Sequence, residues 1–256
     1  MKSFLAFFKK EWMEWSRTGR VLILLLVFVL FGIMNPAIAK ITPWMMEMMA
    51  DSLEGTGLVV TEVTVDALTS WIQFYKNIPI ALIIFILMCS GSFTSEYQKG
   101  TLIPVLTKGL SRWKFVIAKS MMIFISWTAC YWICFGITYA YNAFYWDNSI
   151  AVYTSFAAMC YWLFGLWVLS FMVLFSTLSS SNTTVLLGTG GTVLAVYLIG
   201  LFPKLESLTP MKLTEAMSLL TGLKAPGEYV TPIAISVGMV GICLAVAVTI
   251  FKTKKI

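Results

Sequence analysis

The chain has 256 residues, of which 59% are hydrophobic and only 12% are charged, and its formal net charge is +6. This excess of apolar residues excludes an ordinary soluble domain and predicts an integral membrane protein. The sequence contains no histidine, which excludes Ser-His-Asp triads, histidine acid–base catalysis and histidine-ligated metal sites.

Residues 1–20 are predicted to form an amphipathic helix lying in the headgroup layer of the inner leaflet. Aromatic side chains share one face of a helical wheel, and basic residues take the opposite face, as in interfacial helices. Glu11 interrupts the aromatic face, and a simple basic anchor is the alternative interpretation. The residues expected to anchor the helix to lipid are Phe4, Phe8, Trp12 and Trp15.

Long stretches without charge predict six membrane-spanning helices, because each span needs about 20 apolar residues. The first stretch begins only at Val21, and no small-residue cleavage site follows Ala39, so we expect a spanning helix and not a cleaved signal peptide. The longest stretch, 148–203, is divided at its polar run 179–184. The predicted spans are approximately 21–41, 77–95, 115–141, 150–178, 183–203 and 231–251.

Basic and acidic residues are distributed unequally between the two sides of these spans. If both termini lie inside, thirteen of the 18 basic residues are cytoplasmic and nine of the 12 acidic residues are outside. Cytoplasmic loops of membrane proteins carry such an excess of lysine and arginine. We therefore expect both termini in the cytoplasm of a bacterial cell. Nucleic-acid binding is not expected, because the basic residues are scattered beside helix ends.

The two long outer loops are predicted to contain short helices. In 42–76, Gly55 and Gly57 separate two amphipathic segments, which either cap a pathway or only cover helix ends. Residues 204–230 contain proline and glycine breakers around a helical segment that is apolar enough to re-enter the membrane against protein. The five cysteines lie in apolar runs and are expected to be small buried hydrophobic residues.

The chain shows no energy source of its own. A GxxxxGK[ST] phosphate loop is absent, and the glycine-rich run 188–192 lacks the lysine and lies inside a span. We interpret that run as small residues that allow close helix contact or a hinge. No charged residue lies deep in a predicted span, which argues against ion-coupled transport. Uphill movement of a solute therefore needs another chain to supply the energy.

The inner loop 96–119 is the main polar interruption that should face the cytoplasm between two spans. Gly100 offers a break, and Pro104 suits the first turn of a new helix. Glu96 either caps a helix or contacts a partner, and both interpretations stay open. The loop begins with the sequence Glu96-Tyr97-Gln98-Lys99-Gly100-Thr101-Leu102.

Four features occur together in this chain: the Glu-x-x-x-Gly-Thr-Leu block, six predicted spans, an amphipathic first helix, and Leu208-Thr209-Pro210 in the last outer loop. In these features the chain resembles the permease subunits of type-2 ABC exporters, the ABC-2 family. The resemblance implies an all-α, polytopic, single membrane domain over 1–256, with a cytoplasmic coupling loop at 96–114 and an outer re-entrant loop at 204–230. It also implies two permeases, identical or related, on two cytoplasmic ABC ATPases. ATP and magnesium bind to those ATPases, and no cofactor or metal is expected in this chain. The implied ATPase contacts are Glu96, Tyr97, Lys99, Gly100, Thr101 and Leu102.

The predicted function is therefore that of a plasma-membrane permease, without catalysis of its own, in an ATP-driven exporter. Many aromatic residues in the spans suit an amphipathic or hydrophobic substrate, such as an antimicrobial peptide, a drug or a lipid-like compound, although belts and helix packing explain single aromatic residues. A membrane scaffold or sensor is the alternative function. A lipid-modifying enzyme is disfavoured, because no acid–base pair is suitably spaced. The candidate substrate path comprises Trp127, Tyr131, Ser176 and Thr184.

Overall fold

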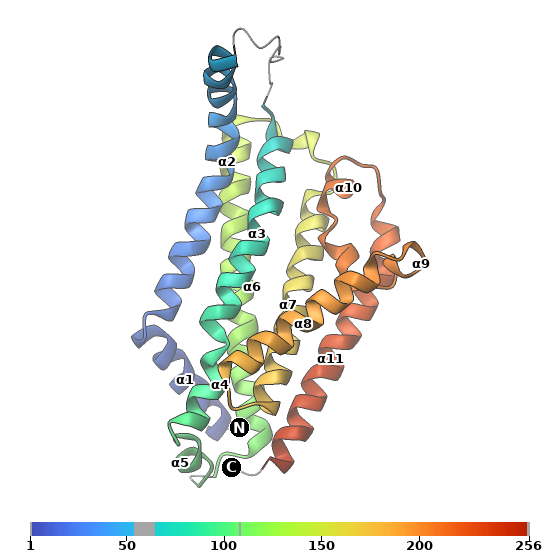
Figure 1. Ribbon diagram of the computed structural model, residues 1–256. Helices are drawn as coiled ribbons and strands as arrows, with labels where there is room; N and C mark the ends of the chain where they lie inside the picture. Colours follow the sequence, from blue (N-terminus) through green and yellow to red (C-terminus); the bar gives the residue numbers. More distant parts are fainter. Residues whose placement is uncertain (1, 54–64, 108, 255–256) are drawn as a thin grey trace.

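The computed structural model describes residues 2–53, 65–107 and 109–254, and these residues form helices and turns without any strand. The long helices run side by side, and both chain termini lie at the same end of the molecule (Figure 1). We call this end the terminal end and the opposite one the distal end. The all-α polytopic fold expected from the sequence is confirmed.

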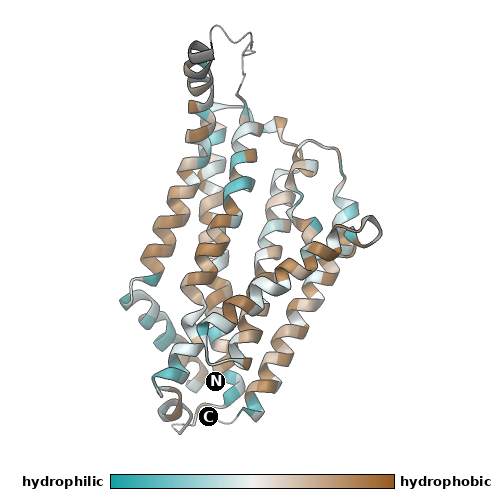
Figure 2. Cartoon of the chain, viewed as in Figure 1, coloured by the Kyte–Doolittle hydropathy of each residue, from teal (hydrophilic) through white to brown (hydrophobic). Residues whose placement is uncertain are grey.

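Among the described residues, six long helices carry stretches that are long and apolar enough to cross a membrane. Their hydrophobic residues form a band along the length of the bundle, with polar residues toward both ends (Figure 2). The number of spans agrees with the prediction. The six helices are α2 (Arg20–Leu53), α3 (Ala67–Cys89), α6 (Arg112–Tyr145), α7 (Thr154–Leu178), α8 (Asn182–Gly200) and α11 (Val230–Thr253).

Short elements lie at both ends of the bundle. At the terminal end, α3 continues through Ser90 into α4, and a turn through Gly100 leads from α4 to α5. α1 also lies at the terminal end, and the remaining short helices connect the long ones away from it (Figure 1). The short elements are α1 (Lys2–Arg17), α4 (Gly91–Gln98), α5 (Leu102–Thr107), η1 (Asn148–Ile150), α9 (Pro203–Glu206), η2 (Pro210–Thr214), α10 (Ala216–Leu220) and η3 (Pro226–Tyr229).

The described part of the loop 42–76 differs from our expectation of separate short helices. α2 continues to Leu53, and α3 begins at Ala67, where Asp66 caps it by accepting a hydrogen bond of 2.9 Å from the Thr69 backbone N–H. The amphipathic pattern around Trp71 belongs to α3, which begins at Ala67 and buries the Trp71 side chain inside the bundle. Gly55 and Gly57 lie outside the described residues.

Glycines let α6, α7 and α8 approach one another closely. A Cβ atom at Gly165 in α7 would lie 2.2 Å from the ring of Trp127 in α6. A Cβ atom at Gly188 in α8 would lie 2.6 Å from Phe175 in α7. The close-contact interpretation of the run 188–192 therefore holds at Gly188.

Replacing Gly165 by valine should destabilise the bundle, because the new side chain overlaps the buried indole of Trp127. Overpacking of this kind lowers the free energy of unfolding by about 1–3 kcal/mol. Thermal unfolding in detergent, followed by tryptophan fluorescence, measures the change. Gly136→Val in α6 is the control, since no atom lies within 4 Å of the Cβ position there. Equal unfolding midpoints for the two variants would contradict the prediction.

Candidate coupling site and apolar cavity

The turn between α4 and α5 is exposed at the terminal end, and it belongs to the loop 96–114 that was predicted from the sequence to contact a partner. We call residues 98–104 the elbow. Gly100 adopts a positive φ of 66°, a conformation that favours glycine, and this reverses the chain after Lys99. Every elbow residue is exposed except Leu102, which is buried. The elbow therefore presents backbone and side chains to a partner.

Five charged side chains meet directly behind the elbow. Lys119 on α6 contacts Glu11 on α1 at 2.9 Å and Glu96 on α4 at 3.1 Å. Lys10 on α1 contacts Glu96 at 2.9 Å, Glu11 at 3.1 Å and Glu14 at 2.7 Å. We call Lys10, Glu11, Glu14, Glu96 and Lys119 the ion cluster. It joins three helices that are far apart in the sequence.

The centre of the ion cluster is buried, although the chain has few charges overall. Glu11, Glu96 and Lys119 are each at most 3% exposed, and Lys119 also donates to the carbonyl oxygen of Ser92 at 2.9 Å. Buried charges of this kind are tolerated only with close partners. Burial alone lowers the pKa of Lys10, but its bonds to Glu14 and Glu96 outweigh that effect and raise the pKa above its ordinary value. Lys10 is therefore charged at neutral pH.

The three carboxylates of the cluster could be mistaken for a metal site. Single oxygens of Glu11, Glu14 and Glu96 lie within 4.8 Å of one another. However, the ammonium groups of Lys10 and Lys119 lie among them. The arrangement is therefore an ion-pair network with a net charge of −1.

The ion cluster explains why Glu11 interrupts the aromatic face of α1. Phe7, Glu11 and Trp15 are spaced by four residues, and all three are buried against the bundle. The expectation that Trp15 faces lipid is therefore corrected, because it packs inside the protein at 2% exposure. Trp12 is exposed, and Phe4 and Phe8 are half-buried, so lipid anchoring by these three stays a prediction. The four-residue spacing was a sequence signal for the inward face.

Tyr97 also points away from the surface of the elbow. Its ring stacks on Phe251 of α11 at a centroid distance of 6.2 Å, and the ammonium group of Lys254 lies 4.2 Å from its centre. Of the predicted partner contacts, Lys99, Gly100 and Thr101 are accessible. Glu96 and Leu102 are buried, and Tyr97 is half-buried against α11.

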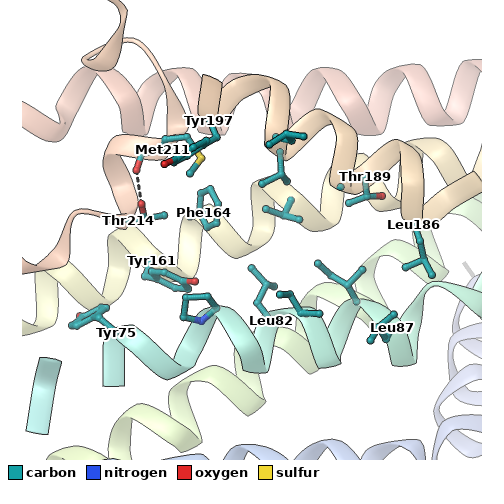
Figure 3. Close-up of a pocket in the computed structure, with 17 residues that line it drawn as sticks. Tyr75, Leu82, Leu87, Tyr161, Phe164, Leu186, Thr189, Tyr197, Met211 and Thr214 are labelled. Carbon is teal, nitrogen blue, oxygen red and sulfur yellow. Dashed lines mark hydrogen bonds between the residues drawn. The ribbon is translucent and has the colours of Figure 1, made fainter. Parts of the chain in front are cut away.

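A second feature is an apolar cavity of about 640 Å³ between α3, α7, α8 and η2. Figure 3 shows α3 and α8 on opposite sides of it, with side chains from both helices and from α7 pointing inward. The hydroxyl group of Tyr75 is buried there and has no hydrogen-bond partner among the described residues. Exposed rim residues, such as Ile83, Leu87 and Leu194, open the cavity to the membrane-facing surface. Its lining includes Tyr75, Leu82, Tyr161, Phe164, Thr189 and Tyr197.

The residues predicted for the substrate path do not line this cavity. Trp127, Tyr131 and Ser176 are buried, and they donate hydrogen bonds to the carbonyl oxygens of Trp162 (3.1 Å), Ala158 (2.8 Å) and Met172 (2.7 Å). Thr184 is exposed near the start of α8. The bonds of Trp127 and Tyr131 join α6 to α7, whereas the bond of Ser176 lies within α7.

The whole chain was also compared with known proteins. The model of a family described as ABC-2 family transporter protein matches residues 5–256. The chain belongs to the ABC-2 transporter family. Searches of curated proteins and of solved structures found no match. As an ABC-2 protein, the chain is a multi-pass membrane permease of an ABC transporter, a transmembrane subunit that associates with an ABC ATPase and is normally not catalytic itself.

Proposed function

We propose that this ABC-2 permease moves an amphipathic or hydrophobic substrate out of the cell through the cavity between α3, α7 and α8. The cavity carries the proposal, because it combines an apolar lining with a few polar groups such as the hydroxyls of Tyr75 and Thr189. Ligand sites for small apolar molecules usually have this composition and a volume of about 300–1,000 Å³. A drug, a lipid-like compound or an apolar part of an antimicrobial peptide fits such a site.

We further propose that the terminal end faces the cytoplasm of a bacterial cell. The excess of lysine and arginine on the pieces of chain assigned to this side supports that orientation. In this arrangement the elbow is available to a cytoplasmic ATPase, which binds ATP and magnesium. Accessible groups at Lys99, Gly100 and Thr101 form the contact, and the inward-facing Glu96, Tyr97 and Leu102 position it.

A complex of two permeases and two ATPases completes the proposal. α8 packs mainly on α7 and leaves large apolar side chains uncovered. Leu187 is 71% exposed, and Leu198 is 51% exposed. A second permease, identical or related, covers part of this surface in the proposed complex, because permeases of ABC transporters work in pairs.

Charge reversal at the elbow tests the coupling contact. Lys99→Glu should weaken binding of the partner ABC ATPase by roughly ten-fold, or about 1.4 kcal/mol. The physical reason is that a reversed charge at a docking surface repels the partner group that it formerly attracted. The amount of ATPase retained on the purified permease and the ATPase rate are the measurements.

Lys252→Glu at the same end is the matched control, since Lys252 is also exposed but lies outside the elbow. Full retention of the ATPase by Lys99→Glu would place the docking surface elsewhere. A complex that hydrolyses ATP in proteoliposomes but exports none of a panel of lipophilic dyes would contradict the transport function and support the scaffold alternative.

A further inference from the structure

The apolar cavity has two chemically different ends. Figure 3 shows Tyr75 and Tyr161 toward one end. Leu87 and Leu186 lie toward the other end (Figure 3). Because α3 begins at the distal end of the bundle and reaches Tyr75 before Leu87, the tyrosines mark the distal part of the cavity. At about 1.5 Å per residue, the stretch of α3 from Tyr75 to Leu87 is about 18 Å long. The cavity can therefore hold a molecule with two unlike ends.

A polar group in the distal part of the cavity lacks a partner. The hydroxyl of Tyr75 lines the cavity, is buried, and has no hydrogen-bond partner among the described residues. Its ring is held by Phe74 at a centroid distance of 5.0 Å and by Tyr161 at 6.2 Å. Buried hydroxyl groups in native proteins are usually bonded, because they have given up their bonds to water. This hydroxyl therefore indicates a ligand that completes its bonding.

Two other hydroxyls of the lining already use their protons. Thr189 donates to the carbonyl oxygen of Val185 at 2.7 Å, within α8. Thr214 donates to the carbonyl oxygen of Met211, also at 2.7 Å. Of these three hydroxyls, that of Tyr75 keeps its proton for a ligand. A phenol donates through this proton. The matching group on the ligand is therefore a hydrogen-bond acceptor.

The lining also restricts the charge of a ligand. Its described residues include no aspartate, glutamate, lysine or arginine. Lys76 follows Tyr75 in the chain, but it is exposed and does not line the cavity. A carboxylate or phosphate head would be buried there without a positive partner, and an ammonium head would lack a negative one, and both arrangements are costly. An uncharged head is therefore favoured.

We propose that the cavity selects uncharged amphipathic molecules whose head accepts a hydrogen bond from Tyr75. Ketones, esters and other carbonyl compounds belong to this class. The apolar tail of such a molecule extends past Leu82 toward Leu87 and Leu186. Tyr75 is thus a specificity-determining residue. The inference rests on the proposed use of the cavity as the substrate site, and it narrows the class of substrate.

Photolabelling of the permease in lipid nanodiscs tests this selectivity. The probe is a long-chain methyl ketone with a diazirine near the end of its tail, which bonds to neighbouring side chains on illumination. The matched probe has the same chain with a methylene group in place of the carbonyl, and both are compared at equal concentration in the lipid. Labelled peptides are identified by mass spectrometry. Labelling counts as cavity labelling when Gly190→Leu, which places a side chain in the cavity, removes it.

The ketone should label peptides that contain Leu87 or Leu186 roughly five-fold more than the hydrocarbon does, since one hydrogen bond to an otherwise unpaired donor contributes about that factor. In Tyr75→Phe, which removes the hydroxyl and keeps the ring, labelling by the ketone should fall to the hydrocarbon level. Labelling by the hydrocarbon should stay unchanged. Tyr141→Phe makes the same substitution at an exposed position of α6 outside the cavity lining, and it should alter neither value.

A third probe tests the charge of the head. The same chain with a trimethylammonium head should label the cavity no more than the hydrocarbon does. Stronger labelling by this probe would overturn the uncharged head and would indicate that the aromatic rings bind a cation. The thermal unfolding midpoint of Tyr75→Phe shows whether this variant is folded. The comparison of the three probes in the natural protein needs no variant at all.

The outcomes separate this selectivity from the proposed transport site. Equal cavity labelling by ketone and hydrocarbon in the natural protein would overturn the selectivity and leave the cavity as the substrate site. A ketone preference that persists in Tyr75→Phe would overturn the role of Tyr75. Absence of cavity labelling by every probe, as expected if a second permease fills the space, would overturn both proposals. A ketone preference that disappears in Tyr75→Phe and persists in Tyr141→Phe would establish Tyr75 as the selecting group.

Discussion

Leucine in place of Gly190 should block transport while the permease stays folded and bound to its ATPase. Gly190 lies on the cavity side of α8, and no atom lies within 4 Å of the position that a Cβ would take. The leucine side chain therefore enters free space inside the cavity and displaces the substrate. Leucine also favours a helix over glycine by up to about 1 kcal/mol, so the helix itself is not weakened.

The expected loss is roughly ten-fold or more in the rate of dye export, which corresponds to at least about 1.4 kcal/mol. Export of lipophilic fluorescent dyes from proteoliposomes that contain the permease and its ATPase is the measurement. Gly241→Leu in α11 is the matched control, because its Cβ position is also open and it lies outside the cavity lining. Equal export by the two variants would show that the cavity is not the substrate site.

Methionine in place of Lys119 should produce the largest loss of stability among the single substitutions considered. Lys119 is 3% exposed and is the partner of both Glu11 and Glu96. Without Lys119, the buried carboxylates of Glu11 and Glu96 have only the partly exposed Lys10 as a charged partner among the described residues. Breaking a buried ion pair from one side lowers the free energy of unfolding by about 3–5 kcal/mol. The thermal midpoint of the purified permease in detergent, read from tryptophan fluorescence, measures this loss.

Two companion variants identify the cause of that loss. Lys99→Met removes an exposed lysine and should change the midpoint little. The triple variant Lys119→Met, Glu11→Gln and Glu96→Gln neutralises the centre of the cluster and should recover most of the stability, because a neutral buried group is tolerated better than an unpaired charge. A triple variant as unstable as Lys119→Met would show that packing, and not charge, dominates at this position.

The six spans could be predicted because hydropathy over about 20 residues is a local property. Their ends were less certain. The polar pair Lys76 and Asn77 suggested the start of a span, whereas α3 begins ten residues earlier at Ala67. Asn77 is accommodated because its side-chain amide donates to Asn35 of α2 at 2.9 Å. Such a bond between helices cannot be inferred from hydropathy alone.

The candidate site was predictable in its outline and not in its internal contacts. The break at Gly100 and the helix around Pro104 follow from local backbone preferences, and both are present. Glu11 and Lys119 are 108 residues apart, and a single sequence does not indicate that they pair. The cavity was missed for a similar reason, because its leucines, tyrosines and threonines are the same residue types that face lipid elsewhere in the spans.

The position of the cavity rim has a consequence for how cargo is selected. Ile83, Leu87 and Leu194 are more than half exposed along the spanning part of the bundle, where the surroundings are hydrocarbon and not water. In the proposed cycle, a molecule therefore loads sideways after dissolving in the bilayer. Its partition coefficient into lipid, more than its aqueous concentration, then determines how often the site is filled. Compounds with the same shape but different oil solubility should differ in apparent affinity accordingly.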